Sequence, residues 1–191
     1  MASLPIFSTT IDEYLAWEME SASKHEYFDG KVVAMAGASF THALIVSNLS
    51  RILAEHLTET PCREFGSDLR VSAAAGRLIC YPDITVACSP FEFLPDAPET
   101  LTNPVFLIEV LSQSTRANDR GYKLPFYREI PSVRGYLLIE QDRVSVEYGR
   151  RISGAQWHVE LTADRTAVLD LAPIRCQTAV SRIYSGVETL A

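Results

Sequence analysis

The feature that most constrains the fold is the segment at residues 104–111, Pro-Val-Phe-Leu-Ile-Glu-Val-Leu, an apolar run interrupted by one carboxylate. A run without polar alternation is typical of a strand that is buried on both faces. A carboxylate at such a position is costly unless it pairs with a cation or binds a metal. The segment therefore predicts a central buried strand, and it makes Glu109 the first candidate functional residue.

Local signals predict the elements before this strand. The sequence Thr10-Ile-Asp-Glu13 has the form of a capping box, which predicts a short helix. Asp29-Gly30 lies between two strand-like runs and predicts a hairpin, because both central positions of a type I′ turn require positive φ. At residues 41–57 apolar side chains recur every three or four positions, which predicts the longest helix of the chain.

Further strands and helices are predicted around the central strand, together with one loop that we expect to be the most mobile segment. In chain order these are strands at residues 62–72 and 78–88 joined by a hairpin loop, the mobile loop at 89–103, a helix from 114 to about 130, a strand at 135–139, an antiparallel meander at 143–148, 156–161 and 167–171, and a helix at 179–184. Pro125 is expected to bend the first of these helices or limit it to its first turns. This order predicts an α+β or mixed α/β fold with one domain over residues 1–191.

Composition excludes several classes of protein. A chain of 191 residues can bury a core without disulfides, and its four cysteines form no CxxC pair, so we expect neither a structural disulfide nor a cysteine metal site. The four histidines include no HxH or HExxH motif, which argues against a zinc enzyme. No apolar run approaches the ~20 residues of a membrane span, and residues 1–10 lack the regions of a signal peptide, so a cytoplasmic location is expected.

The net charge of −7 argues against a basic protein that coats nucleic acid, because such binding depends on phosphate contacts. It does not exclude an enzyme that acts on nucleic acid, since a carboxylate metal site adds negative charge of its own. The charge predicts weak nucleic-acid binding when metal is absent.

A second buried carboxylate is predicted close to the first. Asp83 follows Pro82 at the start of a strand-like run, and Glu109 lies inside the next strong strand. On adjacent strands the two carboxylates would repel each other, and a divalent cation with hard oxygen ligands, Mg²⁺ or Mn²⁺, would relieve that repulsion. The alternative is structural: Asp83 caps a turn, and Glu109 pairs with an arginine.

These residues also carry a resemblance to a known family. Pro82-Asp83 followed 26 positions later by Glu109-Val110-Leu111 resembles the pattern of the PD-(D/E)XK nuclease superfamily. The string at residues 109–127 resembles the Uma-type family of bacterial nucleases, long described as a domain of unknown function. Shorter strings at residues 25–31, 36–42 and 66–71 extend the resemblance over most of the chain.

The resemblance implies a restriction-endonuclease-like core and a metal-dependent endonuclease that hydrolyses nucleic-acid phosphodiester bonds, with DNA as the expected substrate. Asp83 and Glu109 would hold the metal together with the backbone carbonyl of Val110. Glu26 would add a metal ligand or orient the attacking water, and its alternative is an exposed strand acid. A homodimer is expected by analogy with the fold alone.

The chain departs from the superfamily pattern at one position. Leu111 stands where the pattern has a lysine, two residues after the acid. Of the three lysines in the chain, Lys123 follows the Glu109 strand on a predicted helix, and the resemblance implies that a lysine there takes over the role. The structural alternative is a helical ion pair between Lys123 and Asp119, four positions apart.

The remaining candidates have two interpretations each. Asp68 either joins the acidic cluster, pairs with Arg70 or lies in a bulge, and His42 either faces the site or lies on a polar surface. Arg116 and Arg120, with the helix start at residues 112–115, either bind a phosphate of the nucleic acid or are surface arginines.

Two rival functions remain open. One is a catalytically degenerate module that binds nucleic acid or a protein partner, and the other is a hydrolase of a different phosphoester.

Overall fold

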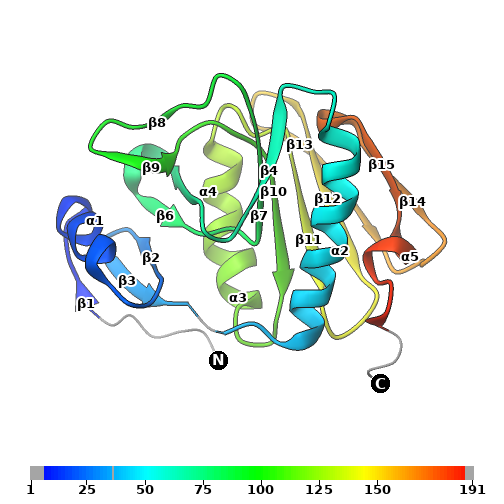
Figure 1. Ribbon diagram of the computed structural model, residues 1–191, viewed down its shortest axis with the longest axis horizontal. Coiled ribbons are helices and arrows are strands. Elements are labelled where there is room, and N and C mark those ends of the chain that lie inside the picture. Colours follow the sequence, from blue (N-terminus) through cyan, green and yellow to red (C-terminus); the bar gives the residue numbers. More distant parts are fainter. Residues whose placement is uncertain (1–6, 36, 188–191) are drawn as a thin grey trace.

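The computed structural model describes residues 7–35 and 37–187, which form two large β-sheets and a separate two-stranded sheet, with helices packed against them (Figure 1). Residues 1–6, part of the segment in which no signal peptide is expected, and Ala36 of the string at 36–42 lie outside the described residues. None of the described helices combines the length and the apolar character needed to cross a membrane.

The central strand is confirmed as β10, Pro104–Leu111, in a six-stranded sheet of order β13-β12-β11-β10-β7-β4. We call this the main sheet. β10 pairs in parallel with β11, Gly135–Glu140, and antiparallel with β7, Ile84–Cys88. The outer strands are β4, Cys62–Gly66, on one side and β12, Val146–Ser153, followed by β13, Gln156–Thr162, on the other.

Helices cover both faces of the main sheet (Figure 1). The longest helix, α2 at Phe40–Leu57, begins at the cap residue Ser39 and buries its apolar stripe against one face, with Ile108 and Val110 in the same cluster. On the other face Leu107 packs with Phe126 of α4, Leu124–Glu129. Because side chains alternate along a strand, Glu109 faces the α4 side.

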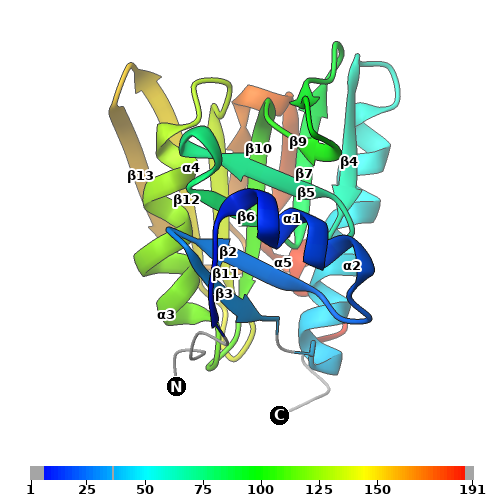
Figure 2. The ribbon, with the colours of Figure 1, turned by 90° about the vertical axis from the view of Figure 1, so that its left-hand side faces the viewer.

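The second sheet lies across the first on the α4 side (Figure 2). We call it the small sheet, and its seven strands have the order β1-β3-β2-β6-β5-β9-β8. They are β1 Phe7–Ser8, β3 Lys31–Ala34, β2 His25–Phe28, β6 Leu78–Cys80, β5 Arg70–Ala73, β9 Ala97–Leu101 and β8 Phe93–Leu94. Helix α1, Ile11–Glu20, starts with the predicted capping box and packs on this sheet through Tyr14 and Leu15. The predicted hairpin turn is also confirmed, with φ of 44° at Asp29 and 87° at Gly30.

Two long strands predicted at residues 62–72 and 78–88 are each broken in two, and each runs from one sheet into the other. The first divides into β4 and β5 at a turn in which the Leu69 N–H donates to the Gly66 carbonyl. The second divides into β6 and β7 around Pro82, which cannot donate a ladder hydrogen bond. Between β5 and β6 lies the short helix η1, Ala74–Gly76. The breaks place Asp83 at the junction of the two sheets.

Two other predictions about connections were wrong. The loop expected at residues 89–103 contains β8 and β9, and β9 pairs with β5. The third strand of the C-terminal meander, β14 at Val168–Leu171, does not continue the main sheet and instead pairs with β15, Cys176–Ala179. The apolar residues of this pair, of η3 at Ala172–Ile174 and of α5 at Val180–Ile183 join the cluster around α2, which explains the departure.

The expectation of no structural disulfide was also wrong, because Cys62 and Cys88 are bonded. They lie directly opposite each other on β4 and β7, where antiparallel pairing brings the two Cβ atoms close together. Cys80 and Cys176 are buried free thiols.

Candidate active site

A cavity of about 660 Å³ lies where the small sheet meets the main sheet and the start of α2. The four predicted catalytic residues and Val110 all line it. Two further residues also line it: His42, which had two interpretations, and Asp119, which was expected only as the partner of a helical ion pair. These six side chains are Glu26, His42, Asp83, Glu109, Asp119 and Lys123. Segments far apart in the sequence therefore contribute titratable groups to one space.

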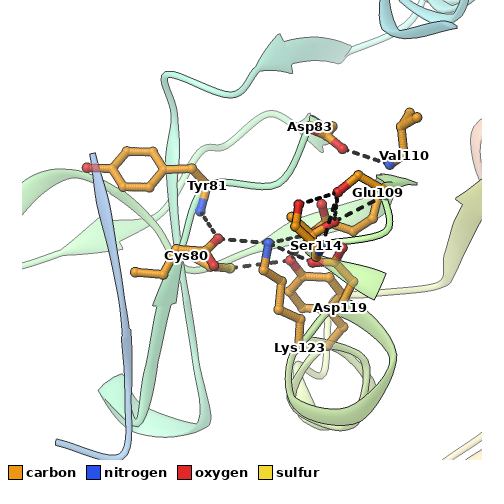
Figure 3. A network of polar contacts seen from close by, with 12 residues as sticks. Cys80, Tyr81, Asp83, Glu109, Val110, Ser114, Asp119 and Lys123 are labelled. Atoms are coloured by element: carbon orange, nitrogen blue, oxygen red, sulfur yellow. Dashed lines mark hydrogen bonds and ion pairs between the residues drawn. The ribbon is translucent and has the colours of Figure 1, made fainter. Parts of the chain in front are cut away.

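One backbone N–H and one histidine side chain hold the carboxylate of Asp83 in place. Its Oδ2 accepts a hydrogen bond of 2.7 Å from the Val110 N–H, which crosses from β10 to the start of β7 (Figure 3). The Nε2 of His42 lies 3.1 Å from the same oxygen. Because β7 and β10 are adjacent, the predicted proximity of Asp83 and Glu109 is confirmed.

His42 lies in the first turn of α2 and faces the site, as one of its two interpretations predicted. Burial lowers the pKa of His42, but the hydrogen bond and the negative charge of Asp83 outweigh this, so the net pKa is raised.

Glu109 is held inside the protein, with a side chain only 4% exposed. Its Oε1 accepts a hydrogen bond of 2.5 Å from the Tyr127 hydroxyl and lies 3.3 Å from the Nζ of Lys123. Burial raises the pKa of Glu109 well above its ordinary value, the Lys123 ammonium opposes that rise, and the carboxylates of Asp119, Asp83 and Glu26 add to it. An arginine partner, the structural alternative for Glu109, is not among its contacts in the described part of the chain.

Lys123 lies among three carboxylates (Figure 3). Its Nζ is 2.8 Å from Oε1 of Glu26, 3.1 Å from Oδ1 of Asp119 and 3.3 Å from Oε1 of Glu109. Burial lowers the pKa of Lys123, but the three acids outweigh it and raise that pKa, so the ammonium stays charged. The helical pair with Asp119 therefore exists, but it is buried in the cavity and does not lie on the surface.

The helix that carries Lys123 widens where it meets the site. α3 at Arg116–Asn118 continues into a π-helical segment, η2 at Asp119–Lys123, and then into α4 without a break. Pro125 lies in the first turn of α4, just after this segment. The i→i+5 bonding of a π-helix makes a wider turn, which keeps Asp119, Lys123 and Tyr127 on one side, and such segments often occur at functional sites.

The apolar surroundings of residue 111 explain why it is a leucine and not the lysine of the superfamily pattern. Leu111 shares a strand face with Glu109 but is fully buried against Leu124, Tyr136 and Leu138. A charged side chain there would be expensive. The ammonium reaches Glu109 from the neighbouring helix through Lys123.

Glu26 is 6% exposed, so the alternative of an exposed strand acid is wrong. Burial raises its pKa, and the charge of Lys123 opposes that rise. Asp68, by contrast, stays outside the cluster with a side chain 96% exposed, and it pairs with Lys24, not Arg70.

Arg116 and Arg120 do not line the cavity. Both pair with the buried carboxylate of Glu140 on β11, and Arg120 also contacts Glu147 on β12. Their proposed contact with nucleic acid stays a prediction.

Asp119 and Tyr127 were not predicted as site residues. A signal for them does exist, because Asp119, Lys123 and Tyr127 recur every four positions. The spacing alone cannot show that the three side chains are buried, since an exposed helical ion pair has the same pattern.

The chemistry of the donor set fits a hard divalent cation. Four carboxylates face one buried ammonium, so the cavity holds an excess of negative charge that protons or a metal must balance. The carbonyl and carboxylate oxygens of Asp83, Glu109 and Val110 are ligands that Mg²⁺ and Mn²⁺ accept. Among residues 7–35 and 37–187 no three acidic, histidine or cysteine side chains converge on one point, because Glu109 is turned toward Lys123 and Tyr127.

The fold is that of a mixed α+β protein, and a solved structure shares it. The structure superposes with a TM-score of 0.77 on a crystal structure from Anabaena variabilis described as a "putative nuclease belonging to DUF820", covering 94% of this chain and 99% of that one. At 20% sequence identity this likeness shows the fold alone.

Sequence comparison identifies the family. The Uma2 family model, described as "Putative restriction endonuclease", matches residues 11–180, so the chain belongs to the Uma2 family. Two proteins of Synechocystis are similar to it. Slr1290 is 34% identical over 97% of this chain and 96% of its own length, and sll1609 is 35% identical over 78% and 84%.

Proposed function

We propose that this protein is a divalent-metal-dependent endonuclease that hydrolyses phosphodiester bonds of nucleic acid, with DNA as the substrate. The observation that carries the proposal is the arrangement around Glu109. Its carboxylate lies inside an apolar strand, contacts the buried ammonium of Lys123 and shares a cavity with Asp83. Its membership of the Uma2 family, whose model is described as "Putative restriction endonuclease", supports the same reaction class.

Asp83, Glu109 and the carbonyl of Val110 would hold Mg²⁺ or Mn²⁺. A bound divalent cation supplies Lewis-acid stabilisation of charge on the phosphoryl oxygen and lowers the pKa of water. His42 and the Val110 N–H orient the carboxylate of Asp83 through the hydrogen bonds described above. Lys123 offers a fixed positive charge to the negative charge that develops on the phosphate during attack.

Glu26 and Asp119, together with Glu109, hold the ammonium of Lys123 in place. Glu26 also accepts a hydrogen bond from the Tyr81 N–H, and its contact with Lys123 connects the small sheet to the site. In this proposal Glu26 positions Lys123 and through it the attacking water.

The test is cleavage of plasmid DNA, single-stranded DNA and RNA with Mg²⁺ or Mn²⁺, comparing the wild type with Asp83→Ala. Metal-dependent cleavage is expected and should be lost in the variant, while Asp96→Asn, a change at an exposed position outside the cavity, keeps it. Unchanged cleavage by Asp83→Ala would contradict the assignment.

A second candidate is a binding module without catalysis, and Leu111 at the usual lysine position favours it. It predicts no cleavage, no metal binding, and nucleic-acid affinity that falls steeply with salt.

A further inference from the structure

Strand β13 forms a free edge of the main sheet. Within the described residues it pairs only with β12, and Figure 2 shows it as the outermost strand on its side. All seven of its side chains are at least partly exposed. Free edges are usually blunted by proline, by charged side chains, by bulges or by short length, because they offer unpaired backbone groups to another strand. β13, Gln-Trp-His-Val-Glu-Leu-Thr, is seven residues long and has no proline or lysine, and its pairing with β12 is irregular only at its start, between Arg151 and Ser153 of β12.

One face of β13 is apolar and incompletely covered. Trp157, Val159 and Leu161 alternate along the strand and therefore share a face. Trp157 contacts the ring of Tyr136, whereas Val159 is 45% exposed and Leu161 is 70% exposed. The apolar stripe thus begins in the core and continues onto the surface.

We propose that β13 pairs antiparallel with β13 of a second copy of this chain, about a two-fold axis that lies between the two strands with Val159 facing its own copy. An axis perpendicular to the sheet keeps every side chain on its own face, so one residue of the strand must lie directly opposite its own copy. Strand β13 runs over Gln156–Thr162, and Val159 is its midpoint. Only this centre pairs the whole strand with its copy.

Charge selects the same register. His158 Nε2 lies 2.9 Å from Glu160 Oε1 of its own chain. Centring on Val159 places His158 opposite Glu160 of the other copy as well, an arrangement that occurs twice. It also places Trp157 opposite Leu161, which covers the exposed end of the apolar stripe. Centring on Glu160 or on His158 instead sets that residue against its own copy, and like charges directly opposite each other are destabilising.

The opposite edge of the main sheet lacks this self-complementarity. Strand β4, Cys-Arg-Glu-Phe-Gly, is five residues long with Glu64 at its midpoint. Pairing β4 with its own copy over its full length would place Glu64 against Glu64. A symmetric dimer requires an edge strand whose charges complement those of its own copy. β13 meets this requirement and β4 does not, so the main sheets of two copies would join through β13.

The experiment is sedimentation velocity of the full chain from about 1 µM to about 100 µM, a range that reports micromolar dimers. The wild type is expected to form dimers, and Leu161→Lys should weaken them on the order of tenfold or more. Val168→Lys is the matched control, because Val168 is an exposed strand residue on β14 at 65% exposure. Circular dichroism checks that each variant is folded.

A charge exchange tests the register itself. Glu160→Lys and His158→Glu each place like charges opposite each other in their own dimer, so each variant alone should be monomeric. Mixed together, they should form a heterodimer, because the introduced lysine of one chain then faces the introduced glutamate of the other. A monomeric wild type, a dimer unaffected by Leu161→Lys, or no recovery on mixing would each overturn the proposal. None of these measurements depends on cleavage activity.

Discussion

Glu109 on β10 and Glu140 on β11 are both buried glutamates on neighbouring strands, 3% and 1% exposed, yet their surroundings differ in charge balance. Glu140 contacts three arginines, Arg116, Arg120 and Arg143, whose side chains reach solvent. Glu109 shares one lysine with two further acids, and Asp83 lies nearby.

The difference separates a structural charge from a functional one. A buried carboxylate surrounded by arginines is neutralised within the protein and can be kept for stability. A buried carboxylate in a group with excess negative charge has a raised pKa and lacks a full set of countercharges. The structural alternative for Glu109 was an ion pair with an arginine. In this protein arginines pair with Glu140 on the neighbouring strand and not with Glu109.

The largest expected effect comes from exchanging the two glutamates for glutamine, one at a time. Glu109→Gln should reduce nucleic-acid cleavage at least about 10³-fold, more than the loss of a single electrostatic donor causes. Glu140→Gln should retain activity and lower the free energy of unfolding by about 1.5–3 kcal/mol, because it removes the hydrogen-bonded charge from its arginines. Cleavage rates and urea denaturation of both variants measure the two effects. Equal loss of activity in both variants would remove the distinction between the two sites.

An intermediate effect is expected for Lys123, the single cation of the Glu109 group. Lys123→Met should lower the single-turnover cleavage rate on the order of 10²-fold, with a smaller change in substrate affinity, because its charge acts on the transition state. Lys123→Arg keeps the charge and should recover part of the rate. A loss shared equally by rate and affinity would instead indicate a substrate-binding role for Lys123.

The smallest expected effect is on stability in the absence of metal. Burial raises the folded-state pKa of Glu109 above its ordinary value of 4.5, so protonation favours the folded protein. This contribution is complete below the unfolded pKa and is lost as pH rises through the folded-state pKa. Glu109→Gln should therefore raise the free energy of unfolding at neutral pH by about 1–3 kcal/mol and flatten its decline with pH.

Chemical denaturation of the wild type and Glu109→Gln in EDTA, from pH 4 to pH 8, measures this difference. Glu20→Gln, an exposed position at the end of α1, is the matched control and should follow the wild type. A neutral-pH stability for Glu109→Gln below that of the wild type would show that the carboxylate is fully compensated.

The parts of the fold that could be predicted depend on local signals. β10, the Asp29-Gly30 turn and α2 follow from an apolar run, a φ requirement and a helical period. The breaks inside residues 62–72 and 78–88 were missed, although Gly66-Ser67-Asp68 and Pro82 interrupt the strand-like pattern at those points. The Cys62–Cys88 bond depends on strand pairing between segments distant in sequence, which composition does not reveal.

The candidate site divides in the same way. Asp83 and Glu109 were predictable because burying a carboxylate is costly, and Lys123 followed from the resemblance and the scarcity of lysines. The burial of Glu26 was not predictable, since it depends on how the small sheet closes over the main sheet. Asp119 and Tyr127 were missed because their direction depends on the π-helical segment.

The broken strands have a consequence for how the molecule unfolds. Because β4 continues into β5 and β6 continues into β7, the small sheet cannot separate from the main sheet without pulling on β4 and β7. We expect the two sheets to open as one cooperative unit and not as separate foldons. Partly opened molecules would then lack Glu26 and the contacts of Lys123 together, so the cluster around Lys123 is complete only in fully folded molecules.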